Sequence, residues 1–364
     1  MVLNDLKRVR SIDKDNMLDT LRRTPDMFEE ALNLAMPSNL DIVKPKLVAF
    51  LGMGGSSVGP GILADWTAET ADVPMLLIRD SKLPKYVSDA ALAVAVSYSG
   101  NTHETVGALL EAERRGCPTV AVSSGGLLEK ACVKRGIAHI KIPSGYLPRC
   151  AFPFLFAAPL RALETGGLVK HGSAELKKAI GALRNLNHRI GIDKVADEND
   201  AKRLATQING TVPLVYGYRE FTHAAYRIKT QLNENSKVPA MYAVVPEVCH
   251  NEVVAWHDGA PEHAKKFGVL LIRSPSEDEE TAVRLNFIKR ILNGQGARVH
   301  EVQAEGAARV ERILTTVYFG DYVSFYLAIL RGVDPSATPG IAVLKREIDS
   351  KTSYRKKVEA ELGS

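Results

Sequence analysis

The sequence predicts an α/β protein with two parallel sheets, each flanked by helices, and helical segments at both ends of the chain. Short apolar runs alternate with amphipathic helical stretches, and these runs do not alternate in polarity, which is typical of parallel strands covered on both faces. The strand pattern stops mid-chain and then returns, which indicates two such units. A chain of 364 residues is long enough for two domains with separate cores.

The N-terminal segment, residues 1–40, is predicted to be helical because its apolar residues recur at helical spacing until Pro37 ends the pattern. Residues 41–165 form the first predicted α/β domain. A helix in this domain carries an apolar stripe that begins at Val106 and is closed by Gly116. Its strands are expected at residues 47–52, 74–80, 92–100, 118–124 and 137–143.

A helical stretch is expected from about residue 152 to 205, and its part from 166 to 205 is the predicted linker. Residues 206–320 form the second predicted α/β domain, and residues 321–364 are predicted to be a helical C-terminal segment. The strands of the second domain are expected at residues 212–218, 240–246, 267–274 and 297–304. The helix after the first of these strands has an apolar stripe of Phe221, Ala224, Ala225, Ile228 and Leu232.

Composition and charge favour small anionic ligands and a cytoplasmic location. The net charge is +5, but Lys and Arg are scattered among Asp and Glu, so solvated helix faces are favoured over a nucleic-acid patch. The four cysteines show neither a CxxC motif nor Cys/His metal spacing, which indicates reduced thiols packed as small apolar residues. The charged N-terminus has no apolar stretch behind it, and the longest apolar run has ten residues, too few to span a bilayer.

Residues 48–61 predict a strand, a glycine turn and a helix with Pro60 in its first turn. Such a junction directs backbone N–H groups and the positive end of a helix dipole to one spot, which suits a phosphate. A dinucleotide site is the nearest alternative, and Asp80 imitates its ribose-binding acid. However, Gly54 is followed by Ser57 where that fingerprint has a third glycine. A purely structural tight turn also stays open.

A second hydroxyl-rich turn, SYSGNT, follows the third predicted strand and contains Ser97, Ser99 and Thr102. Open parallel sheets bind their ligands at the carboxyl ends of the strands, where the two turns are expected to lie side by side. Together they would surround one phosphomonoester with hydroxyl and amide donors. The alternative for the three hydroxyls is helix capping and turn formation.

The motifs GMGGSS and SYSGNTHET together resemble the sugar isomerase (SIS) domain, a phosphosugar-binding α/β fold. Further motifs narrow the resemblance to the bifunctional phosphoglucose/phosphomannose isomerases, known chiefly from archaea. These motifs run in the same order from about residue 47 to 348: GYLPR, NENSK, HNEVVAW and DYVSFYLAILRGVDPSATPGIAVLK. The resemblance implies two SIS-type domains in a homodimer, and an isomerase of glycolysis and gluconeogenesis. Its substrates would be hexose 6-phosphates, converted through a cis-enediolate without metal or other cofactor.

This chemistry needs ring opening, a base to move a proton between C1 and C2, a cation for the enediolate and an anchor for the phosphate. The resemblance places the base at Glu234, in NENSK; taken alone, this residue would be a solvated residue at a helix end. Glu252, in HNEV, is the alternative base, or instead orders His250 or the start of a helix. The resemblance implies that His250 assists ring opening from the neighbouring subunit, although a lone histidine near a strand is usually structural.

The resemblance also gives Arg149 the task of stabilising the enediolate; the alternative is a structural ion pair. It places Thr338 and Lys345 at the sugar. Because Pro339 follows Thr338, helix capping would explain that threonine equally well. We expect Lys345 to border a buried stripe, where a lysine either extends to solvent or meets an anion. The expected stripe consists of Ile341, Leu344 and Ile348.

The phosphate is assigned to backbone and hydroxyl donors of the two turns: Gly54, Gly55, Ser56, Ser97, Ser99 and Thr102. Two rival functions stay open, a non-catalytic phosphosugar sensor on the same fold and an isomerase of another phosphosugar, such as a pentose phosphate. A sensor would keep the hydroxyls but would have no use for Glu234, His250 and Arg149 together. The joint presence of these three residues favours the enzyme.

Overall fold

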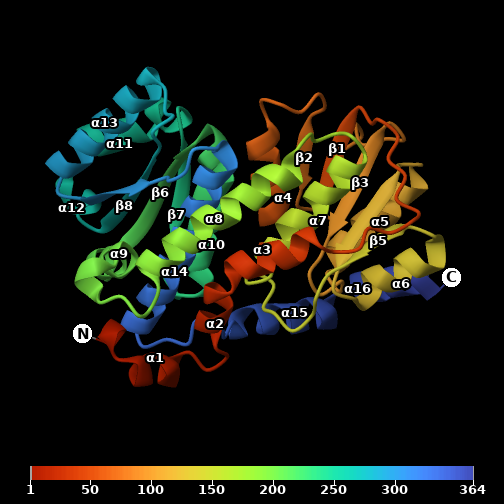
Figure 1. Cartoon of the computed structure of the whole chain (residues 1–364), viewed down its shortest axis with the longest axis horizontal. Helices are drawn as coiled ribbons and strands as arrows, with labels where there is room; N and C mark the ends of the chain where they lie inside the picture. Colours follow the sequence, from red (N-terminus) through yellow and green to blue (C-terminus); the bar gives the residue numbers. More distant parts are fainter. Residues whose placement is uncertain (1, 364) are drawn as a thin grey trace. The chain divides into compact units, whose positions relative to one another are not determined.

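A computed structural model describes residues 2–363, and the chain divides into two compact units (Figure 1). The sheet A unit comprises Asp26–Lys177 and Thr338–Ser364, and the sheet B unit comprises Met1–Pro25 and Lys178–Ala337. Each unit contains one parallel sheet with helices packed on it, which confirms the predicted fold class.

Sheet A has five parallel strands in the order β2-β1-β3-β4-β5. All five coincide with the apolar runs predicted as strands. The central strands β1 and β3 are buried at every residue, as expected for a sheet covered on both faces. The strands are β1 (Leu47–Leu51), β2 (Met75–Ile78), β3 (Ala91–Val96), β4 (Thr119–Ser123) and β5 (Ala138–Lys141).

The helices of the sheet A unit include the one predicted after the third strand, here α5. Close packing of α4 on α7 requires Gly59, because a Cβ there would lie 2.4 Å from the carbonyl oxygen of Leu155. Burial raises the pKa of the Cys132 thiol, on α6, to about 12, so this cysteine behaves as an apolar residue. The helices are α4 (Gly55–Thr67), α5 (His103–Arg114), α6 (Gly126–Arg135), α7 (Phe152–Thr165), α15 (Pro339–Lys351) and α16 (Tyr354–Gly363). Two of the three boundaries between the units fall within α3 (Thr24–Leu32) and α8 (Gly172–Ile190), and the third lies just before α15, between Ala337 and Thr338.

Sheet B has four parallel strands in the order β7-β6-β8-β9, which again match the predicted runs. The strands are β6 (Val212–Tyr218), β7 (Met241–Val245), β8 (Phe267–Arg273) and β9 (Arg298–Gln303). The α-helices of this unit are α1 (Leu6–Ile12), α2 (Met17–Arg22), α9 (Asp200–Ile208), α10 (Thr222–Glu234), α11 (Glu252–Asp258), α12 (Pro261–Ala264), α13 (Glu279–Gly294) and α14 (Arg309–Leu330). Short 3₁₀ turns are η1 (Val2–Asn4), η2 (Ala196–Glu198), η3 (Arg219–Phe221) and η4 (Glu247–His250).

Helix α14 is the core helix of the sheet B unit. Within residues 2–363 it alone is long and apolar enough to cross a membrane by length and composition, but 89% of its apolar window is buried inside the structure. Tyr318 and Tyr326 are fully buried, and their hydroxyls donate to the carbonyl oxygens of Leu21 and Ile190, each at 2.7 Å. These bonds satisfy the polar ends of large buried rings.

The predicted buried stripe on α15 is wrong. Ile341, Leu344 and Ile348 are 45%, 58% and 42% exposed, and α15 has no buried residue. The helical spacing correctly identified an amphipathic face, but spacing cannot show whether another segment covers that face. Lys345 therefore lies on an exposed helix rather than beside a buried stripe.

Candidate active site

The glycine turn after β1 leads directly into α4. The residue before the helix, Gly54, has a φ of 51°, a conformation in which a side chain would be strained. No side chain caps α4, and a Cβ built at Gly54 would have no atom within 4 Å, so the space beside the turn is open. An uncapped helix N-terminus with open space before it is a favourable position for an anion.

Ser56 joins this turn to the second one. Its hydroxyl oxygen accepts a hydrogen bond of 3.0 Å from the backbone N–H of Tyr98, and the residue is only 6% exposed. A serine hydroxyl can accept and donate at once, so the Ser56 hydrogen can still be donated to a ligand oxygen. The structure thus brings the two hydroxyl-rich turns into direct contact.

In the second turn, the fully buried Ser97 donates to the hydroxyl oxygen of Thr102 at 3.1 Å. Thr102 occupies the N-cap position of α5, but its side chain makes no capping hydrogen bond. Capping therefore does not account for Thr102, whereas Ser99 does accept a turn hydrogen bond of 3.2 Å from the N–H of Asn101. Gly100 is required for space as well as for its φ of 66°, because a Cβ there would lie 1.7 Å from the carbonyl oxygen of Gly125.

Arg149 lies next to the glycine turn. A Cβ built at Gly55 would approach the Cα and N atoms of Arg149 to 3.3 Å, and the arginine is only 4% exposed. Such a buried guanidinium is stable only where its charge and N–H groups are compensated. The backbone of Arg149 in the sheet A unit thus lies beside the glycine turn.

A cavity of about 540 Å³ in the sheet A unit brings Lys345 together with Thr102 of the second turn. Thr102 and Lys345 both line it, with His103, Lys130 and Tyr354 among their neighbours. Thr338 occupies the N-cap position of α15 and, like Thr102, makes no capping hydrogen bond with its side chain.

Glu234 and His250 belong to the sheet B unit. Glu234 is the last residue of α10, at the helix end that its polar neighbours indicated. His250 is exposed and ends the 3₁₀ turn η4, so it lies beyond the end of β7 rather than on the strand. Each residue ends an element that comes after a strand of sheet B. Glu234 ends α10, which comes after β6, and His250 ends η4, which comes after β7.

The alternative base, Glu252, is engaged in a hydrogen-bond network at the start of α11. Its carboxylate accepts from the hydroxyl of the buried Tyr216 at 2.7 Å, and that hydroxyl accepts from the indole N–H of Trp256 at 2.9 Å. Burial, and then the neighbouring Glu252 carboxylate, raise the pKa of Tyr216. These contacts favour an ordering role for Glu252 in the segment that carries His250. Sequence reasoning missed Tyr216. The available signal was a tyrosine within an apolar strand, because the hydroxyl of a buried tyrosine needs a hydrogen-bond partner.

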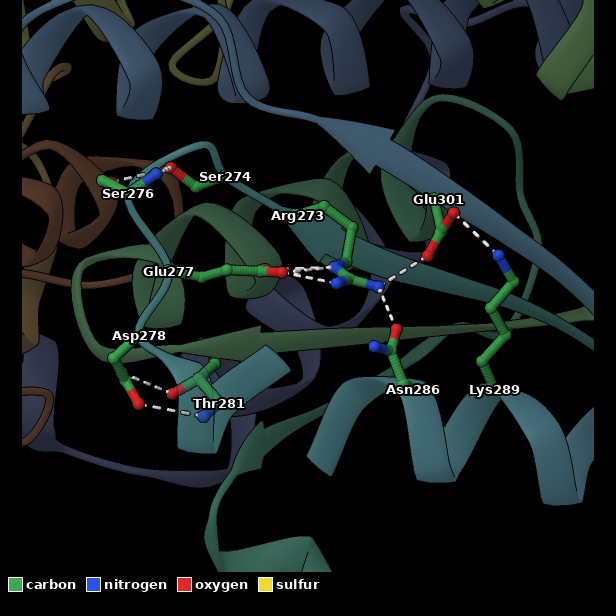
Figure 2. Close-up of polar contacts among 9 residues, drawn as sticks. All are labelled: Arg273, Ser274, Ser276, Glu277, Asp278, Thr281, Asn286, Lys289 and Glu301. Carbon is green, nitrogen blue, oxygen red and sulfur yellow. Dashed lines mark hydrogen bonds and ion pairs between the residues drawn. The ribbon is translucent and has the colours of Figure 1, made fainter. Parts of the chain in front are cut away.

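Sheet B has its own serine-containing turn after β8, the strand that neighbours β6 as β3 neighbours β1. Figure 2 shows that this turn is closed by ion pairs. Arg273 donates to both carboxylate oxygens of Glu277 and, at 2.6 Å, to Glu301. Glu301 also accepts from Lys289 at 2.8 Å. Burial would raise the pKa of Glu301, but Lys289 and Arg273 outweigh burial and lower it.

Helix α13, which follows this turn, is capped at its N-terminus by the side chain of Asp278. Asp278 accepts hydrogen bonds from the backbone N–H and the hydroxyl of Thr281 at 2.9 and 2.8 Å, and Ser274 contacts Ser276 at 2.9 Å (Figure 2). Two cations facing two carboxylates leave no net positive charge for a phosphate. Compared with the turn after β8, the turn after β3 in sheet A is therefore the better phosphate site.

Known proteins resemble the chain over most of its length. Residues 197–348 match the family described as bacterial phospho-glucose isomerase C-terminal SIS domain. A bifunctional phosphoglucose/phosphomannose isomerase of Caldicellulosiruptor bescii is 30% identical over 91% of this chain and 98% of the relative. One of Aquifex aeolicus is 32% identical over 85% and 92%. A D-glucosamine-6-phosphate 4-epimerase of Sulfolobus acidocaldarius is 28% identical over 74% and 81%.

Among solved structures, the C-terminal domain of glucosamine-fructose-6-phosphate aminotransferase from Francisella tularensis has a TM-score of 0.65 at 15% identity. The match covers 88% of this chain and 98% of that one. At this identity the likeness shows the fold alone.

Proposed function

Because the chain belongs to the family of bifunctional phosphoglucose/phosphomannose isomerases, we propose that it interconverts glucose 6-phosphate and mannose 6-phosphate with fructose 6-phosphate. The observation that carries this proposal is the pair of turns in the sheet A unit, joined by the bond from Tyr98 to Ser56. They present uncapped helix N-termini and hydroxyl groups at one edge of a parallel sheet. That arrangement suits the phosphate shared by all three sugars.

The proposed phosphate ligands are Gly54, Gly55, Ser56, Ser97, Ser99 and Thr102. Ser97 and Thr102 already hydrogen-bond to one another, which orients both hydroxyls before a ligand arrives. Preorganised donors cost little to align on binding. Lys345, on the cavity that Thr102 also lines, would meet the sugar together with Thr338.

Glu234 is the proposed base. From the open-chain aldose it removes the proton on C2 and returns it to C1. The hydroxyl proton on O2 is lost and O1 gains a proton, so the aldehyde becomes a ketone with no change in composition. Arg149 would stabilise the negative charge of the intermediate cis-enediolate, a role that a fixed cation can perform without a metal ion. His250 would assist opening of the sugar ring.

We further propose a homodimer in which His250 acts in the site of the neighbouring subunit. Strand β7 is an edge strand of sheet B, and Met241 and Tyr242 on it are 47% and 37% exposed. Helix α11, which follows His250, has no buried residue, and Val254 on it is 59% exposed. An apolar sheet edge of this kind is a favourable surface for a second copy. A cytoplasmic location suits an enzyme of hexose phosphates.

The activity is tested with purified, chelator-treated protein and each hexose 6-phosphate, following the formation of fructose 6-phosphate. Turnover of both glucose and mannose 6-phosphate is expected. Glucosamine 6-phosphate and ribose 5-phosphate serve as comparison substrates for an epimerase and a pentose phosphate isomerase. Binding of hexose phosphates without turnover would instead identify a sensor.

The shared site is tested by mixing Glu234→Gln subunits with His250→Ala subunits under exchange conditions. A heterodimer regains one complete site if His250 acts across the interface, so activity should return. Mass spectrometry verifies that heterodimers form. Heterodimers without recovered activity would contradict the shared site.

A further inference from the structure

The three residues after Glu234 are held by polar contacts that the proposed reaction does not use. Asn235 and Ser236 are 1% and 0% exposed. The Asn235 amide donates to the hydroxyl of Ser324 at 3.0 Å, and the Ser236 hydroxyl donates to the carbonyl of Ser324 at 2.7 Å. The Arg331 guanidinium donates to the Ser236 carbonyl at 2.9 Å. The end of α10 is thereby fastened to α14.

Lys237, the last residue of this segment, has an uncommon backbone conformation. Its φ of 55° lies in the left-handed region, which is uncommon for residues other than glycine. This bend brings the ammonium nitrogen back to the helix end, where it lies 2.8 Å from the carbonyl oxygen of Glu234 and 3.2 Å from that of Asn235. It also lies 2.6 and 3.2 Å from the carbonyl oxygens of Asp334 and Pro335.

These acceptors explain why a lysine is suited to this position. The last carbonyl groups of a helix have no partner within the helix, and a cation near them compensates the negative end of the helix dipole. An ammonium group offers three N–H donors, which four carbonyl oxygens share here. Lys237 therefore connects the backbone of Glu234 itself to the loop after α14.

The register of α10 is fixed further along the same helix. Arg227 donates to Asp321 at 2.7 Å and Gln231 donates to the other carboxylate oxygen of Asp321 at 3.0 Å, all three side chains being buried. A general base is effective only when held close to the proton it removes, and a displacement of about 1 Å can cost about a hundredfold in rate. Lys237 is the last contact of this series and binds the Glu234 carbonyl directly.

We propose that Lys237 is a positioning residue, which holds the backbone of Glu234 so that its carboxylate reaches the C1 and C2 protons. This inference rests on the proposed function, in which Glu234 is the base. Lys237 itself does not contact the sugar in this proposal. Its removal should therefore affect the chemical step rather than substrate binding.

The test is a double-mutant cycle of the full chain with Lys237→Met, Glu234→Gln and both together, assayed with glucose 6-phosphate. Lys237→Met should lower kcat between about tenfold and about a hundredfold, since the base is misplaced. KM should change less than about threefold, because uniform binding is kept. On the Glu234→Gln background the same change should lower kcat less than about twofold, because there is no longer a base to position. Lys229→Met, on the same helix, is the matched control and should keep kcat.

Thermal unfolding of each variant accompanies the kinetics, and Lys237→Gln replaces Lys237→Met if the latter does not fold. A kcat within about twofold of wild type would overturn the inference. An equal loss on the Glu234→Gln background would overturn it too, since Lys237 would then act independently of the base. Failure of both Lys237 variants to fold would also overturn the inference, because Lys237 would then maintain the fold rather than position Glu234. A wild type without isomerase activity would refute the proposed function and this inference with it.

Discussion

Replacing Asp321 by asparagine removes one charge of the ion pair that fixes α10 to α14. Asp321 and Arg227 are only 4% and 3% exposed in their side chains, and their charged atoms lie 2.7 Å apart. Asparagine keeps the size of the side chain but removes the carboxylate charge that faces the Arg227 guanidinium in the interior. Breaking a buried ion pair in this way costs about 3–5 kcal/mol.

This loss is a substantial fraction of the free energy of unfolding of a typical domain, about 5–15 kcal/mol. At roughly 2–4 °C per kcal/mol for a unit of this size, Asp321→Asn should lower the Tm by about 6–20 °C. Because α10 carries Glu234, the folded fraction should also show a lower kcat with glucose 6-phosphate. Thermal and chemical unfolding followed by circular dichroism measure the Tm and the free energy of unfolding. The isomerase assay, at a temperature where the variant is folded, measures kcat.

The matched control is Asp193→Asn, because Asp193 forms an exposed pair with Arg22 at 3.6 Å, with side chains 70% and 47% exposed. Exposed pairs contribute about 0–1 kcal/mol, so this variant should unfold close to the wild type. If Asp321→Asn cost less than about 1 kcal/mol, or no more than the control, the reasoning from burial would be refuted.

Three further predictions concern the phosphate turns, a buried lysine and substrate choice. Ser97→Ala with Thr102→Ala should raise KM for every hexose 6-phosphate alike, because the phosphate is common to them; an unchanged KM would reduce both hydroxyls to turn-forming groups. Burial lowers the pKa of Lys202 to about 8, so between pH 8 and its unfolded value near 10.5 the unfolded chain binds more protons, and stability rises with pH. In Lys202→Met, the free energy of unfolding measured across that window should lack this rise, and an equal slope in both proteins would contradict the assignment. Thr338→Gln should depress mannose 6-phosphate turnover more than glucose 6-phosphate turnover, by about tenfold in the ratio of kcat/KM, because a longer side chain restricts rotation about C2–C3. A constant ratio would exclude Thr338 as the residue that admits both sugars.

The central strands β1 and β3 were predictable from the sequence because each is a short apolar run, and burial on both faces of a parallel sheet requires such a run. Strand β9, RVHEVQ, is more polar and only partly buried, so this reason does not extend to it. The glycine turn that contains Gly54 was also predictable, since a tight turn favours glycine where the backbone is left-handed. Glu234 at a helix end followed from its polar neighbours. These features depend on residues within a few positions of one another.

Contacts between distant segments were decided only by the tertiary structure. The Ser56 bond to Tyr98, the Tyr216 bond to Glu252 and the closure of the β8 turn by Glu301 join residues far apart in the chain. No local pattern encodes which donor meets which acceptor across such a separation. The exposed face of α15 has the same origin, because periodicity specifies an apolar face and only the packing of the remaining chain decides whether anything covers it.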